Sequence, residues 1–216
     1  MPVDPVVELR GAVCVTGGFP TLAGVDLAVT AGEVCFVSGD NGAGKTSLLR
    51  LLAGLTPLAS GAGTVLGVDL STDRRTLRPM VGLLGHGTGM YDELSVLENL
   101  RFFASASRLP LDGLDAALDL VALPARVRVL PMVSLSAGQR RRAALAGLVL
   151  RRPRLWLLDE PHTGIDGSGR LLVDRLITGA AAAGATVVFA SHETERAAAI
   201  ATRQVEMAGG TVSGPQ

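Results

Sequence analysis

The sequence has little cysteine, almost no lysine, no net charge and no long apolar run. Its formal net charge is zero, which disfavours a nucleic-acid scaffold recognised by bulk electrostatics. Cys14 and Cys35 form neither a CxxC pair nor zinc-ligand spacing, so we expect two reduced, buried thiols. The longest apolar candidate, residues 176–190, is interrupted by glycine and threonine and is shorter than the roughly 20 residues of a membrane span. Residues 1–10 have acid and proline where a secretion signal has basic residues, so we expect a cytoplasmic protein.

The pattern of apolar residues predicts strands that alternate with helices. A chain of 216 residues, 48% of them hydrophobic, is long enough for one substantial α/β core. Strands are expected at 6–16, 22–30, 32–39, 154–160 and 185–191, and helices at 45–55, 136–152, 169–184 and 193–203. The alternation indicates a mainly parallel sheet covered on both faces.

A helical block at about 83–140 is expected as an insertion between the two halves of this core. Within it we predict helices at 95–108 and 111–123, with Ser95 and Asp112 as their N-caps. The tail of the chain predicts a hairpin around Gly209 and Gly210.

The segment GDNGAGKT (39–46) matches the pattern G-x-x-x-x-G-K-[ST] between an expected strand and an expected helix. Glycines let backbone N–H groups approach phosphate oxygens, and the start of the helix adds a favourable dipole. Lys45, the only lysine in the chain, supplies a compact charge to the β- and γ-phosphates, and the Thr46 hydroxyl can ligate Mg²⁺. The pattern alone does not separate kinases, GTPases and transport ATPases. The expected nucleotide ligands are Gly39, Asp40, Asn41, Gly42, Ala43, Gly44, Lys45, Thr46 and Ser47.

Two acidic residues end the apolar stretch LWLLDE (155–160). We expect Asp159 to hold Mg²⁺ through water at the end of a strand, and Glu160 to polarise the attacking water. Paired acids before Pro161 are also typical of a plain turn, but the nucleotide pattern upstream favours the catalytic interpretation. His192 follows the apolar stretch VVFAS, where a histidine can contact the γ-phosphate and orient the water of Glu160.

The segment LSAGQRRR (135–142) begins a further helix, with Ser136 as its N-cap. Such a helix start can bind a phosphate, so Ser136, Gly138 and Gln139 are candidate nucleotide ligands. Because the Lys45 loop already covers one side of the γ-phosphate, this second helix start suggests a site completed by another subunit. Asp166, in the turn HTGID, could reach across such a dimer. The alternative is an ordinary capped helix whose arginines form a solvated face.

The order of these motifs resembles that of the ATP-binding-cassette (ABC) ATPase family over about residues 6–210. The motifs are, in order, the glycine-rich loop, LSAGQ, LLDE, the Asp166 turn and His192. The resemblance implies a RecA-like P-loop core with an N-terminal antiparallel β-subdomain and an inserted α-helical subdomain. It implies a single domain over 1–216, with the core at about 1–82 and 141–216 and the helical subdomain at about 83–140.

The resemblance also implies the cofactors and partners. Head-to-tail dimers would hold two ATP molecules with Mg²⁺, and Ser136 and Gly138 of one chain would complete the site of Lys45 in the other. The implied partners are therefore a second ATPase subunit and separate integral membrane permease subunits, and the implied location is the inner face of the cell membrane. No nucleic-acid partner is expected.

His86 stands where the family normally has a glutamine that senses Mg²⁺ and meets the membrane partner. Mg²⁺ prefers oxygen ligands, so we expect His86 to act through water or in coupling alone. The segment LLGHGTGMYDELSVLENLRF, with NGAGKTSLLRLLAGL and LSAGQRRRAALA, resembles the ATPase subunit of heme exporters that serve cytochrome c maturation. The resemblance implies an ATP-hydrolysing translocase subunit in heme export.

Three features depart from the family pattern. Asp40 stands where proline is common, and His162 has no assigned role. No tyrosine lies upstream to stack on adenine; Thr16 holds that place, with Phe19 nearby.

The alternatives are another ABC exporter subunit and a soluble, non-transport cassette ATPase, such as a translation or DNA-repair factor. The latter class usually joins two cassettes in one chain or carries a long coiled-coil insertion, and neither is present here. A catalytically inactive binding module is opposed by Lys45, Asp159, Glu160 and His192.

Overall fold

A computed structural model describes residues 5–213 of the chain. The strands are Val7–Thr16 (β1), Phe19–Val29 (β2), Val34–Ser38 (β3), Ser60–Val65 (β4), Val68–Asp69 (β5), Val81–Leu84 (β6), Leu155–Asp159 (β7), Thr186–Ala190 (β8), Arg203–Ala208 (β9) and Thr211–Ser213 (β10). The α-helices are Lys45–Leu52 (α1), Val96–Ala106 (α2), Leu114–Leu120 (α3), Ala125–Arg128 (α4), Ala137–Arg151 (α5), Gly167–Ala182 (α6) and Thr194–Ile200 (α7). Two 3₁₀ turns lie at Arg74–Leu77 (η1) and Met132–Ser134 (η2).

The chain divides into two compact units. The first contains the residues up to Leu83, Pro153–Glu160 and the residues from Ile177 onward; the second contains Leu84–Arg152 and Pro161–Leu176. All of α5 belongs to the second unit, whereas we expected residues after 140 in the core. The predicted division of a single domain into core and helical subdomain therefore stays a prediction.

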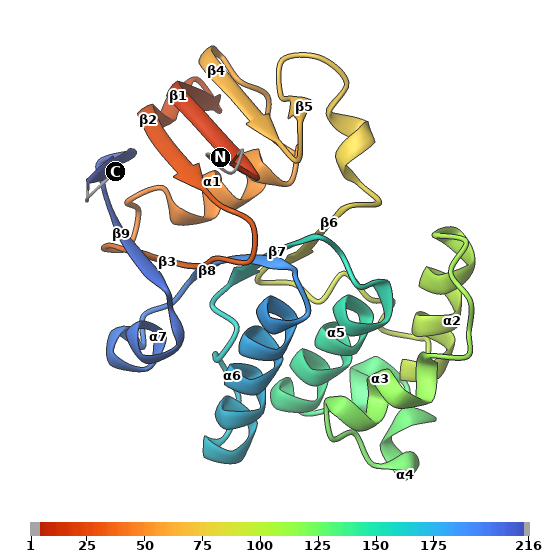
Figure 1. The fold of residues 1–216 in the computed structure, drawn as a ribbon. Coiled ribbons are helices and arrows are strands. Elements are labelled where there is room, and N and C mark those ends of the chain that lie inside the picture. The colour runs from red at the N-terminus through yellow and green to blue at the C-terminus, as the bar shows by residue number, and fades with distance from the viewer. Residues whose placement is uncertain (1–4, 214–216) are drawn as a thin grey trace. The chain divides into compact units, whose positions relative to one another are not determined.

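The first unit is built around two sheets (Figure 1). The smaller sheet has the order β2-β1-β4-β5 and pairs its strands antiparallel. The larger sheet has the order β10-β9-β3-β8-β7-β6, in which β3 runs parallel to β8 and β9, and β7 parallel to β8. The predicted hairpin is confirmed, because β9 and β10 pair antiparallel around Gly209 and Gly210. The expected α/β class, with an antiparallel sheet, a parallel-rich sheet and a helical part, is confirmed.

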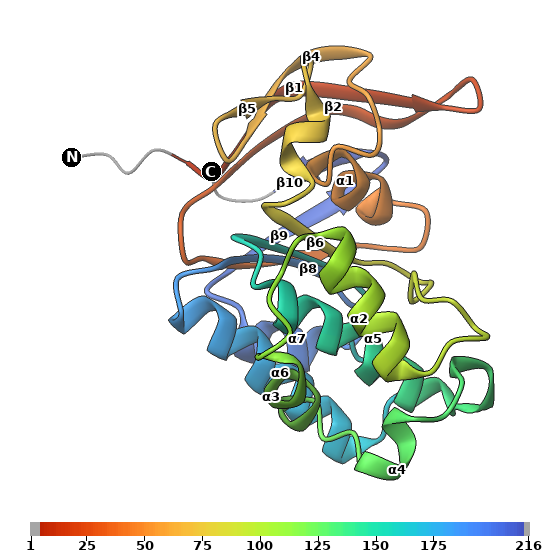
Figure 2. The same ribbon diagram turned by 90° about the vertical axis from the view of Figure 1, so that its right-hand side faces the viewer.

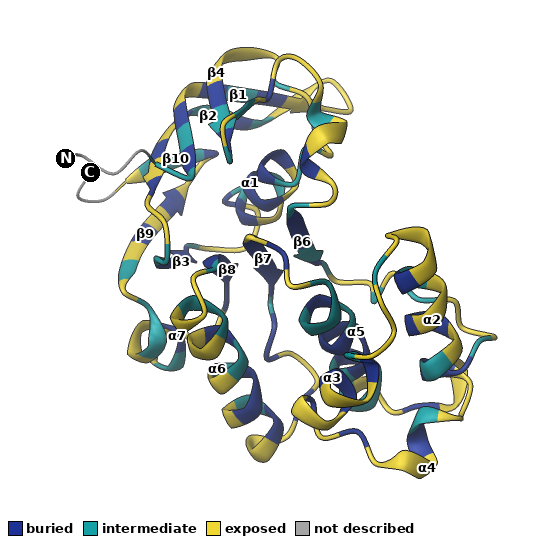
Figure 3. Cartoon of the chain, turned by 45° about the vertical axis from the view of Figure 1, so that its right-hand side comes forward, coloured by how far each residue is buried: buried dark blue, intermediate teal, exposed yellow. Residues whose placement is uncertain are grey.

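Burial explains why β3, β7 and β8, three neighbouring strands of the larger sheet, are mostly apolar. All residues of β3, β7 and β8 are buried, as expected for parallel strands covered on both faces. Helix α1 lies between the two sheets (Figure 2), with Leu48, Leu49, Leu51 and Leu52 fully buried. Figure 3 shows the same burial along α1, β7 and β8. This packing fixes the start of α1 beside the ends of the parallel strands.

The second unit is mostly helical. Helices α2 and α3 pack on α5, and the fully buried Asn99 closes the loop before α2. Its amide nitrogen donates to the carbonyls of Tyr91 and Ser95, both at 3.0 Å, and its oxygen accepts the Tyr91 N–H at 2.8 Å. Ser95 caps α2 as predicted, in a capping box with Glu98. Among residues 5–213, no helix combines the length and the apolar character needed to cross a membrane.

The predicted N-cap at Asp112 is wrong. Helix α3 begins two residues later, with Gly113 in the cap position and no side-chain capping bond. The segment before the helix is a turn in which Leu114 N–H donates to the Leu111 carbonyl, so Asp112 lies inside that turn.

Candidate active site

The loop between β3 and α1 has a backbone that requires glycine. Gly39 has a φ of 134°, and a Cβ there would lie 2.2 Å from the carbonyl oxygen of Met207. Gly44 has a φ of 107°, and its Cβ would lie 2.9 Å from the Thr21 carbonyl oxygen. A side chain at either position would force the loop away from its neighbouring strands. Two glycines of GDNGAGKT, Gly39 and Gly44, are therefore needed because neighbouring strands lie close to the loop backbone.

Lys45 opens α1 and is only 7% exposed. Its Nζ donates to the carbonyls of Gly39 and Asp40, the latter at 2.9 Å. The ammonium group is therefore held over the loop, directly at a helix start where anions are favoured.

Thr46 and Asp159 bring α1 and β7 together. The Thr46 hydroxyl donates to Asp159 Oδ2 at 2.8 Å, although the two residues are far apart in sequence. Asp159 is the last residue of β7 and is buried. A hydroxyl and a carboxylate therefore meet beside the Lys45 loop.

Glu160 and His192 form the next contact along the same sheet edge. Glu160 N–H donates to the Ala190 carbonyl at 3.0 Å, which continues the pairing of β7 with β8. Its Oε2 accepts the backbone N–H of His192 at 3.1 Å, and its Oε1 lies 3.4 Å from His192 Nε2. The Glu160 side chain is 12% exposed and the His192 side chain 54%, so a sheltered carboxylate lies against a histidine that reaches water.

The start of α5, in the second unit, has the predicted cap. Gln139 N–H donates to Ser136 Oγ at 3.3 Å, and Ser136 N–H donates to Gln139 Oε1 at 3.0 Å. An open groove of about 550 Å³ is lined by Ser136, Gly138 and Gln139 together with the Asp166 turn. The Gln139 side chain is engaged in capping its own helix.

Asp166 holds the beginning of α6. Its Oδ1 accepts the Gly169 N–H at 2.8 Å, the Ser168 hydroxyl at 3.1 Å and Arg142 Nη2 at 3.2 Å. These bonds, led by the Gly169 N–H, hold the pKa of the Asp166 carboxyl below its ordinary value. The turn therefore carries an ionised carboxylate next to the start of α5.

His86 and His162 both lie in the second unit. His86 is exposed in the bend that follows β6. His162 is 1% exposed, with Nε2 2.9 Å from Asp174 Oδ1 of α6, so it fixes the turn to that helix. In the first unit, Thr16 and Phe19 face each other across the β1–β2 hairpin, and Phe19 is 76% exposed.

Sequence reasoning missed the residues that hold these loops. Arg141 is buried and donates to the Gly85 carbonyl, and Arg142 contacts Asp166. The available signal was the arginine run after LSAGQ, whose alternative interpretation was a solvated face.

Five of the predicted site residues come together at the carboxyl ends of β3, β7 and β8: Lys45, Thr46, Asp159, Glu160 and His192. A glycine-rich phosphate loop beside a hydroxyl–carboxylate pair and a sheltered glutamate defines a P-loop nucleoside-triphosphate hydrolase.

Comparison with known proteins identifies the family. The model of the ABC transporter family matches residues 22–163. The cytochrome c biogenesis ATP-binding export protein CcmA of Rhodopseudomonas palustris is 42% identical over 201 residues, covering 93% of this chain and 96% of that protein. CcmA of Nitrobacter winogradskyi is 38% identical over 200 residues, with the same two coverages. The chain belongs to the ABC transporter family and is an ATPase of that family.

A solved structure shows the same fold at lower identity. The dimeric structure of an ATP-binding cassette in a post-hydrolysis state, bound to ADP and Pi, superposes with a TM-score of 0.84 at 21% identity. The match covers 97% of each chain.

Proposed function

We propose that this chain is the ATP-hydrolysing subunit of an ABC transporter, acting as a head-to-tail dimer on a separate membrane permease. The observation that carries the proposal is the meeting of Lys45, Thr46, Asp159 and Glu160 at one sheet edge. These residues supply a phosphate-binding cation, a hydroxyl–carboxylate pair and a general base.

In the proposed reaction Lys45 binds the β- and γ-phosphates of ATP. Glu160 accepts a proton from water as the water oxygen bonds to the γ-phosphorus, and the bond from that phosphorus to the bridging oxygen breaks. The products are ADP and inorganic phosphate. The His192 backbone N–H holds the Glu160 carboxylate in position, and its imidazole is placed to contact the γ-phosphate.

The residues beside the phosphate loop fit Mg²⁺. Thr46 Oγ1 and Asp159 Oδ2 lie 2.8 Å apart, and Mg²⁺ takes a few protein oxygens together with phosphate and water oxygens. When bound, the ion neutralises charge on the phosphate oxygens. His86 is proposed to act through water or in coupling alone, because imidazole is a poor ligand for this ion.

The start of α5 supports the dimer. Ser136 and Gly138 line a groove at a capped helix start, and in the proposed dimer they complete the site of the partner chain's lysine. The dimeric solved structure, which has the same fold, is consistent with this arrangement. Gln139 is proposed to contribute through the helix cap.

The cargo is proposed from the relatives. Both reported relatives are named as export proteins of cytochrome c biogenesis, and their matches cover almost the whole chain. Heme export in cytochrome c maturation is therefore the proposed process, at the inner face of the cell membrane.

The proposal is tested by isolating the partners of the Glu160→Gln variant, tagged and held with ATP in mild detergent. We expect a chain dimer that copurifies with a polytopic membrane protein and with cytochrome-assembly proteins, and loss of this complex in Lys45→Ala. Recovery of ribosomal or DNA-repair proteins alone would contradict the transporter assignment and favour a non-transport cassette ATPase.

A further inference from the structure

Three successive arginines follow Gln139 on α5, and the second of them is buried. Arg141 is 7% exposed and its Nη1 donates to the Gly85 carbonyl oxygen at 2.6 Å. Gly85 directly precedes His86, so this bond connects α5 to the base of the His86 loop. The two residues are 56 positions apart in the sequence.

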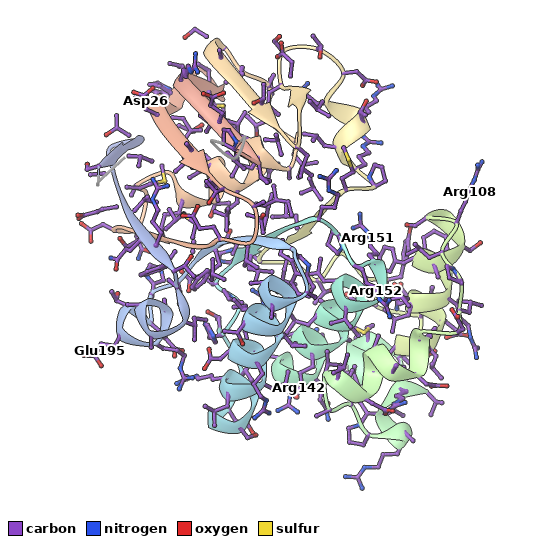
Figure 4. All side chains as sticks on the ribbon, in the orientation of Figure 1. Asp26, Arg108, Arg142, Arg151, Arg152 and Glu195 are labelled. Carbon is purple, nitrogen blue, oxygen red and sulfur yellow. The ribbon has the colours of Figure 1, made fainter. Side chains whose placement is uncertain are left out.

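The third arginine makes the corresponding contact on another side of the helix. Arg142 Nη2 donates to Asp166 Oδ1 at 3.2 Å, and its Nη1 donates to the Ala122 carbonyl at 3.4 Å. Space at this junction is tight, since a Cβ on Gly169 would lie 2.9 Å from the guanidinium. The Asp166 turn is thus attached to the same turn of α5 as the His86 loop. Figure 4 labels Arg142 near the beginning of α5, with Arg151 and Arg152 at the opposite end.

Stability alone is a poor explanation for these two contacts. The Asp166 side chain is 71% exposed, and exposed ion pairs contribute little to folding. Burying a guanidinium costs desolvation energy, and apolar side chains of similar volume often stabilise a buried site as well or better. Both contacts do, however, fix the direction of a loop relative to the helix, because a guanidinium donates in a planar, defined geometry.

We propose that Arg141 and Arg142 are positioning residues that make the start of α5, the His86 loop and the Asp166 turn move as one body. The inference rests on the proposed function, in which the start of α5 completes the ATP site of the partner chain. A displacement of the His86 loop then moves Ser136 and Gly138, and the coupling between this loop and hydrolysis passes through Arg141.

The first test compares Arg141→Met, Arg141→Lys and Arg152→Met in steady-state ATP hydrolysis by the full chain. Arg141→Met should lower kcat about tenfold with KM for ATP and binding of a fluorescent ATP analogue unchanged, and Arg141→Lys should recover part of the rate. Arg152→Met, the control at the other end of α5, should keep the wild-type kcat. A purely structural role would instead lower the melting temperature and leave kcat per folded molecule unchanged, which would overturn the proposal.

Hydrogen exchange reads the tether directly and does not depend on turnover. Arg141→Met should speed exchange of the amides in residues 86–90 while leaving residues 39–47 as in the wild type. Equal exchange at 86–90 in both proteins contradicts the tether.

A double-mutant cycle tests the contact between Arg142 and Asp166. Arg142→Met and Asp166→Asn should each lower kcat, and the double variant should be no slower than the slower single one. Independent, multiplicative losses refute a shared role.

If wild-type hydrolysis survives in Lys45→Ala, the proposed function fails. If hydrolysis needs Lys45 but is unchanged by substitution of Arg141 and Arg142, only the proposal about these two arginines fails.

Discussion

Replacing Glu160 with glutamine tests the proposed base with almost no change in shape. A glutamine oxygen can still accept the His192 N–H that Glu160 Oε2 accepts at 3.1 Å, so the site should keep its geometry. The amide cannot accept a proton from water. Loss of a general base costs about 10²–10⁴ in rate, which corresponds to about 3–5 kcal/mol of transition-state stabilisation.

The assay is phosphate release at saturating ATP, with ATP affinity measured separately by fluorescence. We expect kcat to fall about 10²–10⁴-fold while the affinity for ATP stays within about twofold, since Lys45 is untouched. Lys45→Met is the matched control and should lose affinity as well as rate. A Glu160→Gln variant that hydrolyses ATP at more than about a tenth of the wild-type rate would refute the role of Glu160 as base.

Three further sets of substitutions test the local physics of the site and of the fold. Gly39→Ala places a methyl group against a backbone oxygen of β9 and should abolish ATP binding in titrations. Gly67→Ala is the control, because Gly67 has a φ of 78° and open space around it. This control should lower the free energy of unfolding by about 1 kcal/mol in denaturant titrations and should still bind ATP. Ser136→Ala and Ser95→Ala each remove a capping box, so each should lower the free energy of unfolding by about 1 kcal/mol. Only Ser136→Ala should also slow ATP hydrolysis, because only Ser136 lies at the proposed dimer site. Equal effects of the two variants on hydrolysis would contradict the dimer proposal. Burial, and then the nearby charge of Glu33, raises the pKa of the Cys35 thiol from 9.0 to about 12, which corresponds to about 4 kcal/mol. This contribution to stability is fully present below pH 9.0 and is lost as the pH rises toward 12. Over this pH range the free energy of unfolding should therefore fall more steeply for the wild type than for Cys35→Ala. Parallel curves for the two proteins would contradict the raised pKa of Cys35.

The two helix caps and the C-terminal hairpin were predicted correctly from the sequence because their cause is local. Ser95 and Ser136 are N-caps because the residue three positions later returns the hydrogen bond, and that spacing can be seen in the sequence. The β9–β10 hairpin follows from two adjacent glycines with positive φ. Asp112 has the residue type of a cap but lies in a turn, and residue type alone does not locate the first helical residue.

The features that were missed depend on contacts between distant parts of the chain. Arg141 reaches a carbonyl 56 residues away, and nothing in the run RRR indicates which arginine is buried. His162 pairs with Asp174, twelve residues further on, in a helix whose orientation toward the turn is decided by packing. Such partners become visible only when the fold brings the segments together.

The backbone at Glu160 links the chemistry of the site to its cost in stability. Five described non-glycine residues have a positive φ, and three of them, Arg108, Ala122 and Arg152, lie one or two residues after the end of a helix, where a left-handed residue ends the hydrogen-bond pattern. Glu160, with a φ of 52°, instead follows a buried strand. A left-handed conformation at such a residue costs of the order of 1–3 kcal/mol and persists only where the surroundings enforce it. Here the Ala190 carbonyl and the His192 N–H hold the backbone and the carboxylate of Glu160, so β8 and the residues after it maintain the strained conformation that presents the proposed base.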